Sequence, residues 1–273
     1  MEWSKIKNII ILILLTVNVL LLGLLTYRES ASRAQSSELL ADAVAILDSN
    51  GVSLSQSLVP QATTLPALSM ERDPTLEASL AERLLGTCQA EVSGATYTYV
   101  SSNGSAIFRS TGDFVVTYSA QGSPQAEGPL SDHALSLLQS AGLSCQLTGQ
   151  THGDGQTLVT LCQLWEGMPV FTCQITLTYQ DQSLMSIQGR RAMAAQGSVL
   201  SQSTLSAPTA LVRFLSAIIA GGEVCNEITR IQPGYQMVVS LTAPITLRPV
   251  WRLTTDTGQF DVDLTTGEAA RVS

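Results

Sequence analysis

The sequence predicts an α+β protein, with one N-terminal transmembrane helix followed by extracytoplasmic lobes in which helices pack on antiparallel sheets. Three observations lead to this prediction. A long apolar run follows a short charged head, alternating strand-like segments dominate the rest of the 273-residue chain, and a helix followed by such strands occurs twice near the C-terminus. Helices that cover one face of an antiparallel sheet are typical of α+β folds.

The first thirty residues contain the most distinctive pattern, a charged head followed by an apolar run. Residues 1–8 hold both lysines of the protein, Lys5 and Lys7, whereas residues 9–27 carry no charge. About 20 apolar residues in a helix span a bilayer, and lysines beside such a helix favour the cytoplasmic side. We therefore expect a single-pass anchor in the cell membrane over residues 9–27, with the N-terminus in the cytoplasm and the body outside. The alternative is a secretory signal peptide cleaved after Ala34.

The body divides into three predicted lobes. The first, residues 35–122, opens with a helix that Ser37 can cap. After a proline-containing linker and a second short helix, it continues into an antiparallel meander with a turn at Asn103-Gly104. The second lobe, residues 129–196, and the third, residues 204–273, each begin with a capped helix and continue into alternating strands.

The third lobe resembles a repeat of the second. A Pro-Val-aromatic segment begins at residue 169 and again at residue 249, an offset of 80 residues. In both copies a capped helix comes before this segment and an alternating strand comes after it. We therefore expect these two lobes to be a duplication of one helix-on-sheet unit.

Composition argues against several classes of function. A net charge of −8 and a pI near 4.7 disfavour nucleic-acid binding, which needs clustered basic side chains. The five cysteines include no Cys-x-x-Cys pair, so the sequence has no zinc or thioredoxin-like motif. A hairpin loop at Gly167-Met168 would place Cys162 opposite Cys173, within range of a disulfide. The alternative is that both cysteines are small buried hydrophobic residues.

No enzyme signature is present, so we expect no catalytic residue, cofactor, metal site or small-molecule substrate. His133 is expected to be solvated in the first turn of a helix, and His152 and Asp154 are expected in a glycine-rich turn. Asp261 and Asp263 alternate on one strand and are expected on its polar outer face. An exported hydrolase is the alternative, and it requires two such carboxyl groups to converge at about 5–10 Å.

Several other side chains are expected to be structural. The arginines at 190–191 and the pair at 248 and 252 are expected to be surface charges. Aromatic residues at alternating strand positions are expected to pack the core of the first lobe, with a glycan-stacking platform as the alternative. These aromatic residues are Tyr97, Tyr99, Phe108, Phe114 and Tyr118.

The predicted anchor also carries candidate contact residues. Helices associate in lipid through small residues that allow close approach and through polar side chains that form hydrogen bonds. Thr16 and Gly23 are seven residues apart and lie near one helix face, and Asn18 places an amide near mid-span, where it needs a partner. We predict Thr16, Asn18 and Gly23 as contacts to a partner helix.

The head and the apolar run together resemble the start of the YycI type within the YycH/YycI family of two-component-system regulatory proteins. Within MEWSKIK, the matching residues are Glu2, Trp3, Ser4, Lys5 and Lys7. Residues 248–268 are similar to the family's final strands and to PepSY-like lobes. The resemblance is specific over about the first 25 residues and architectural over the rest.

The resemblance implies a membrane-anchored, non-enzymatic regulator of a cell-wall-controlling sensor histidine kinase in Gram-positive bacteria. Such a protein would act through its transmembrane helix and extracytoplasmic lobes, beside a YycH-like partner in the membrane. The alternative is a membrane-tethered module with PepSY-like lobes that binds a peptide, a protease or a cell-wall ligand.

Overall fold

The structure is a computed structural model that describes most of the body of the chain. It describes residues 14, 17, 18, 20, 35, 37–60, 65–192, 197–202, 205–240 and 244–272. Thr16, Gly23 and most of the predicted anchor over residues 9–27 lie outside this part. Across the described residues, no helix combines the length and the apolar character needed to cross a membrane.

The described body is a mixed α+β fold rich in strands. Helices form over residues 37–49 and at α2 (Pro74–Leu85), α3 (Leu130–Ser140) and α4 (Ala207–Gly221), and a 3-10 helix, η1, covers Gln56–Leu58. The strands are β1 (Ser53–Leu54), β2 (Pro66–Met70), β3 (Gln89–Ser93), β4 (Thr96–Ser101), β5 (Gly104–Arg109), β6 (Asp113–Tyr118), β7 (Cys145–Gly153), β8 (Gln156–Trp165), β9 (Met168–Gln180), β10 (Ser183–Arg190), β11 (Gly197–Gln202), β12 (Glu227–Val238), β13 (Ile245–Thr255), β14 (Gly258–Asp263) and β15 (Ala269–Arg271).

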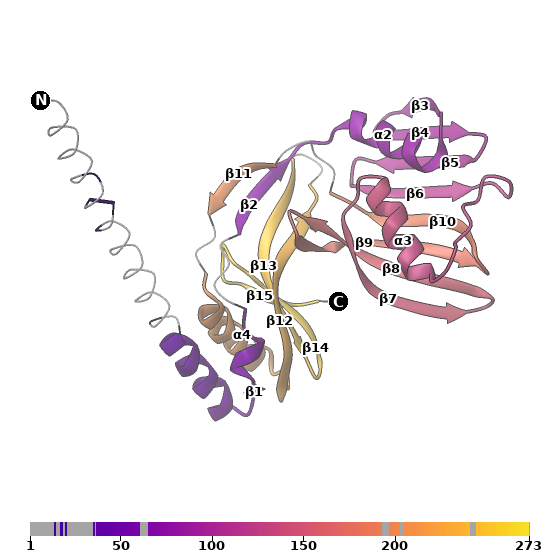
Figure 1. The fold of residues 1–273 in the computed structure, drawn as a ribbon. Coiled ribbons are helices and arrows are strands. Elements are labelled where there is room, and N and C mark those ends of the chain that lie inside the picture. Colours follow the sequence, from indigo (N-terminus) through magenta and orange to yellow (C-terminus); the bar gives the residue numbers. More distant parts are fainter. Residues whose placement is uncertain are drawn as a thin grey trace, which may run out of the picture.

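The strands form two sheets that are joined along β9. Sheet 1 has the strand order β3-β4-β5-β6-β10-β9-β8-β7, and all of its pairs are antiparallel. Sheet 2 consists of β1, β2 and β11–β15 around the long β12–β13 pair. Helices α2 and α3 lie over sheet 1, and α4 lies against sheet 2 (Figure 1).

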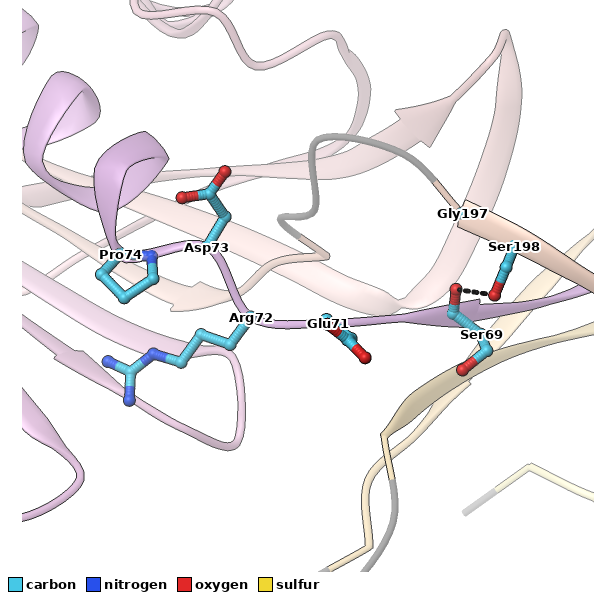
Figure 2. A pocket seen from close by; sticks show the side chains of 7 residues that line it. All are labelled: Ser69, Glu71, Arg72, Asp73, Pro74, Gly197 and Ser198. Atoms are coloured by element: carbon cyan, nitrogen blue, oxygen red, sulfur yellow. Dashed lines mark hydrogen bonds between the residues drawn. The ribbon is translucent and has the colours of Figure 1, made fainter.

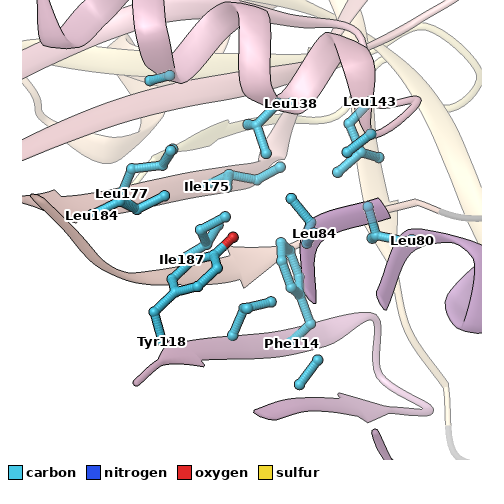
Figure 3. Packing of buried hydrophobic residues seen from close by; sticks show 14 of the residues in the cluster. Leu80, Leu84, Phe114, Tyr118, Leu138, Leu143, Ile175, Leu177, Leu184 and Ile187 are labelled. Carbon is cyan, nitrogen blue, oxygen red and sulfur yellow. The ribbon is translucent and has the colours of Figure 1, made fainter. Parts of the chain in front are cut away.

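Sheet 1 and its two helices enclose the larger hydrophobic core. Helix α2 begins at Asp73, whose carboxylate accepts a hydrogen bond from the Thr75 backbone N–H, and it ends at Gly86 with a φ of 78°. Alternate residues of β9 point toward the helices, so Ile175 and Leu177 are fully buried. Figure 3 shows these two side chains facing leucines from α2 and α3.

Sheet 2 buries one face under α4 and the helix over 37–49. Leu47 from the first helix and Phe214 from α4 belong to the same buried cluster as Trp251 and Phe260 from the sheet. The rings of Phe214 and Phe260 meet edge to face with their centroids 5.1 Å apart. The opposite face of sheet 2 carries the polar residues of β12 and β13.

The structure divides the body differently from the predicted lobes. The predicted first lobe, residues 35–122, contributes its first helix, β1 and β2 to sheet 2, where β2 pairs with β13. Its meander joins sheet 1 instead, because β6 pairs with β10 in a register that places Val116 opposite Ile187. A meander with an open edge and one apolar face gains hydrogen bonds and burial by extending a neighbouring sheet. The two predicted repeat segments occupy β9 and β13, each the central strand of an antiparallel meander.

Strand β9 connects the two sheets. Its Val170 pairs with Tyr235 of β12 in sheet 2, whereas residues from Ile175 onward pair with β8 and β10 in sheet 1. Gly234 makes the crossing possible, because a Cβ atom at this position would lie 2.6 Å from the Pro169 carbonyl oxygen and from the Phe171 ring. The two sheets therefore meet beside Phe171.

Candidate functional site

A cleft of about 290 Å³ lies between the two sheets on the side where β7, β8 and β9 face β12, β13 and β14. Eight of its lining residues carry amide, hydroxyl or guanidinium groups, and both sheets contribute them. The lining residues are Gln146, Leu147, Thr148, Cys162, Phe171, Gln174, Arg230, Gln232, Arg252, Thr254 and Gln259. This cleft is the candidate functional site.

The polar face of sheet 2 forms one wall of the cleft as an ordered array. Arg230 and Gln232 are two residues apart on β12 and share a face. In the strand register they pair with Thr254 and Arg252 of β13, and Thr254 in turn pairs with Gln259 of β14. Directly paired residues have Cβ atoms about 5 Å apart. The wall therefore presents two parallel rows of polar side chains.

Arg252 is held at the floor of the cleft by a buried ion pair. Its Nε donates to Asp261 Oδ1 at 2.7 Å and a terminal nitrogen donates to Oδ2 at 2.6 Å. The Gln236 amide also donates to Asp261, whose side chain is only 3% exposed. The Arg252 guanidinium lies 4.0 Å from the centroid of the Phe171 ring. Because Asp261 neutralises it, Arg252 is a structural group in this site.

Five polar lining side chains are left without a partner. Within the described part of the chain, no side-chain hydrogen bond or ion pair is formed by Arg230, Gln146, Gln232, Gln259 and Thr254. Among the described residues, the lining includes two arginines and no carboxylate, and Asp261 already compensates one of the arginines. This described lining therefore has a net positive charge in a protein whose overall charge is −8.

Cys162 lines the cleft as a protonated thiol. Burial raises the pKa of Cys162 to about 11, and its Sγ lies 3.3 Å from the Val170 carbonyl oxygen, to which it donates. Cys173 is buried in the junction between the sheets, and burial raises its pKa to about 12. A protonated thiol is a poor nucleophile and a poor metal ligand.

The predicted disulfide between Cys162 and Cys173 is wrong, because both cysteines are free. The hairpin turn lies at Glu166-Gly167, one residue before the predicted loop, so that Trp165 pairs with Met168. The register then shifts between Cys162 and Leu164 and places Cys162 opposite Gln174. The alternative, that both cysteines are small buried residues, describes the structure.

The histidines occupy separate places in sheet 1. His152 is exposed near the end of the β7–β8 hairpin, where its Nδ1 lies 2.8 Å from the Thr157 hydroxyl, and Asp154 lies in the adjoining turn. His133 was expected to be solvated but is half-buried at the start of α3. Its Nδ1 lies 2.8 Å from the Tyr179 hydroxyl, and burial lowers its pKa.

The paired aspartates of β14 have different structural roles. Asp261 was expected on an outer face, but it is buried in the ion pair with Arg252 because its face of the strand lines the floor of the cleft. Asp263 accepts hydrogen bonds from the backbone N–H groups of Thr265 and Thr266 and so stabilises the turn after β14. Asp154 lies far along the chain in the β7–β8 turn of sheet 1.

The predicted aromatic core is confirmed, and it contains a buried arginine. Tyr99, Phe108, Phe114 and Tyr118 are buried in the core of sheet 1, and Tyr97 is partly buried against it. Arg191 was expected at the surface but is only 2% exposed, with its guanidinium 4.6 Å from the centroid of Phe108. A terminal nitrogen of Arg191 lies 3.3 Å from the carboxylate of Glu77, and burial lowers the pKa of Arg191 to about 10. Sequence alternation gave no sign of this burial.

A second, more open depression of about 620 Å³ lies beside the connector from β2 to α2. Figure 2 shows that its lining comes from Ser69 of β2, from the connector, from Pro74 at the start of α2 and from the start of β11. Its charged groups are largely used locally. Arg72 forms two hydrogen bonds to Glu77, and Asp73 caps α2. The Ser198 hydroxyl donates to the Ser69 carbonyl oxygen at 3.4 Å. We do not assign a binding role to this depression.

Asn18 is the described member of the three predicted anchor contacts. Its amide nitrogen donates to the Leu14 carbonyl oxygen at 2.8 Å, four residues earlier. One donor hydrogen of the amide is therefore used locally, which leaves the second donor hydrogen and the carbonyl oxygen for a partner. The contact role of Thr16, Asn18 and Gly23 remains a prediction.

Sequence reasoning did not identify Arg230, Gln146, Gln232 or Gln259. These residues come from three strands that span positions 146 to 259 of the chain, and no motif connects them. The one sequence feature that could have indicated these residues was the alternation of polar residues in β12. The same alternation is typical of an ordinary solvated strand face.

Comparison with known proteins gives a limited result. No family model and no curated protein matches the sequence. Among solved structures, an uncharacterized protein from Eubacterium rectale ATCC 33656 is similar at 10% identity and a TM-score of 0.44, over 79% of this chain and 87% of that chain. The Bacillus megaterium YpeB C-terminal domain is similar at 9% identity and a TM-score of 0.38, over 75% of this chain and 99% of that domain. Neither similarity bears on function.

Proposed function

We propose that this protein is a membrane-anchored, non-enzymatic regulator of a cell-wall-controlling sensor histidine kinase, related to the YycI type and acting beside a YycH-like partner. The observation that carries the proposal is the head over residues 1–8 followed by the uncharged run over residues 9–27. The head matches the family at Glu2, Trp3, Ser4, Lys5 and Lys7, and the run has the length and composition of a transmembrane anchor.

The body offers a physical route between anchor and lobes. The helix over 37–49 begins shortly after the end of the predicted anchor and packs through Ala43, Val44 and Leu47 into the core of sheet 2. Nine residues of sequence, 28–36, therefore separate the predicted anchor from a packed element of the body. A regulator of this kind shifts its kinase by binding one kinase state more tightly than another.

A crosslinked membrane pull-down from the native host tests the proposal. The full chain is compared with the same body on an unrelated transmembrane anchor. Recovery of a sensor kinase with the native anchor alone supports regulation through the transmembrane helix. Recovery with both anchors supports regulation through the lobes. If no kinase is recovered with either anchor, the regulatory proposal is wrong.

The cleft between the sheets favours a second candidate function, a membrane-tethered binding module for a peptide, protease or cell-wall ligand. Its unpartnered polar side chains and net positive charge are the specific observation. A photo-crosslinking amino acid placed at Gln232 in the full chain would test it in the host, with Gln188, an exposed residue of β10, as the control position. Capture of a ligand of defined mass at 232 and not at 188 supports the binding module, and equal capture at both contradicts it.

A further inference from the structure

We propose that the cleft between sheet 1 and sheet 2 binds the C-terminal carboxylate of a short extended peptide, with Arg230 as the charge partner and Gln146, Gln232 and Gln259 as hydrogen-bond partners of its backbone. The inference rests on the second proposed function, in which the body binds a ligand. It is independent of any contact with a kinase.

The charge of the cleft selects an anion. Arg252 is neutralised by Asp261, whereas Arg230 has no acidic partner among the described residues. Arg230 is also exposed, so a ligand can reach its guanidinium without displacing another protein group. A guanidinium presents a planar set of donors that matches the two oxygens of a carboxylate.

The neutral groups of the cleft match the peptide backbone. A glutamine amide offers two donor hydrogens and an acceptor oxygen, as needed to pair with both the C=O and the N–H of a peptide group. Gln232 and Gln259 lie on the wall formed by sheet 2, and Gln146 lies on β7 in sheet 1. An extended peptide between the walls can therefore form hydrogen bonds on both of its sides.

The spacing of the wall fits an extended chain. Arg230 and Gln232 are two positions apart on β12, which corresponds to about 6.6 Å along a strand. An extended ligand repeats its outward-facing groups at the same interval. With its carboxylate at Arg230, its preceding peptide groups lie level with Gln232. Leu147 of β7 is 46% exposed and provides an apolar contact for a ligand side chain.

The size of the cleft favours a chain end over a through-running segment. A volume of about 290 Å³ is at the lower limit of small-molecule sites, which is enough for a few residues and not for a long strand. A chain terminus carries its charge at its end, so it can place that charge at Arg230 without continuing beyond the cleft.

The test measures binding of defined tetrapeptide pools to the full chain in lipid nanodiscs. One pool has random sequences with free C-terminal carboxylates, a second has the same sequences with C-terminal amides, and a third has amidated ends and an internal glutamate. A fourth pool ends in a D-residue with a free carboxylate, which distinguishes a cell-wall stem from a protein C-terminus. Retained peptides are identified by mass spectrometry, and the best ligand is titrated by calorimetry.

We expect retention from the free-carboxylate pools and little from the amidated ones. Arg230→Gln should weaken the best ligand by roughly tenfold or more, because it removes a charge-assisted hydrogen bond, and Arg230→Lys should restore part of the affinity. Arg109→Gln, at an exposed position of β5 outside the cleft, is the matched control and should bind as the wild type does.

Three results would overturn the inference: equal retention of amidated and carboxylate pools, wild-type affinity in Arg230→Gln, or retention of none of the pools. If no pool binds and crosslinking at position 232 still captures a ligand, the proposed ligand class is wrong and the binding module stands. If neither experiment gives a ligand, both proposals fail.

Discussion

Asp261→Asn should destabilise the body by breaking the buried ion pair at the floor of the cleft. The Asp261 carboxylate accepts two hydrogen bonds from Arg252 and one from Gln236. Asparagine keeps the size of the side chain but removes its charge, and its NH2 group would face these donors. Arg252, with a side chain only 12% exposed, would then be a buried cation without a counter-charge.

The expected magnitude follows from this burial. Removing one partner of a buried ion pair costs about 3–5 kcal/mol. Because Arg252 keeps some solvent exposure and its contact with Phe171, we expect the lower end, about 3 kcal/mol. With a urea m-value of about 2 kcal/mol per molar, this loss lowers the unfolding midpoint by about 1.5 M.

The effect is measured by urea unfolding of the full chain in nanodiscs, with tryptophan fluorescence as the signal. This signal reports on the ion pair because Trp251 is buried next to Arg252 on β13. The matched control is Asp154→Asn, which removes a carboxylate from an exposed turn and should change the free energy of unfolding by less than about 0.5 kcal/mol. Replacing both partners, Arg252→Met with Asp261→Leu, should recover most of the loss. A loss below about 1 kcal/mol in Asp261→Asn, or a double variant as unstable as the single one, would refute this account.

Three further outcomes are expected. Asn18→Leu should reduce kinase co-purification while urea unfolding of the body stays unchanged, because the bond to the Leu14 carbonyl oxygen uses only one donor hydrogen of the amide and leaves its other polar groups for a partner. Co-purification at the wild-type level would exclude a contact role for Asn18. The free energy of unfolding should fall as the pH rises from about 9 to about 11, because burial raises the pKa of Cys162 to about 11 in the folded state and folding therefore favours the protonated thiol. Cys162→Ala should reduce this pH dependence, and an identical pH profile in the variant would contradict the role given to the Cys162 thiol. Gly234→Ala should push Phe171 away from β12 and loosen the cleft, since the added Cβ would lie 2.6 Å from the Phe171 ring and from the Pro169 carbonyl oxygen. Amide hydrogen exchange at Val170 and Tyr235 should become faster, and exchange as slow as in the wild type would show that the crossing of β9 and β12 tolerates the methyl group.

The sequence predicted features that depend on residues a few positions apart. Asp73 and Pro74 mark the start of α2, because a side-chain cap and a fixed φ act within one helical turn. The alternation of Tyr99, Phe108 and Phe114 predicted a buried strand face, because side chains two residues apart on a strand point the same way. The α+β class follows from such local signals.

Tertiary structure alone decided which elements meet. The pairing of β6 with β10 joins residues about 70 positions apart, and the helix over 37–49 shares a buried cluster with α4, far along the chain. The alternation of apolar and polar residues predicts that a strand has one apolar and one polar face, but it does not predict which neighbouring element covers either face. Arg191 is therefore buried where a surface charge was expected. Arg230 and Gln232 have the sequence pattern of a solvated strand face, yet they line a cleft. They do so because the crossing of β9 from one sheet to the other places sheet 1 opposite them.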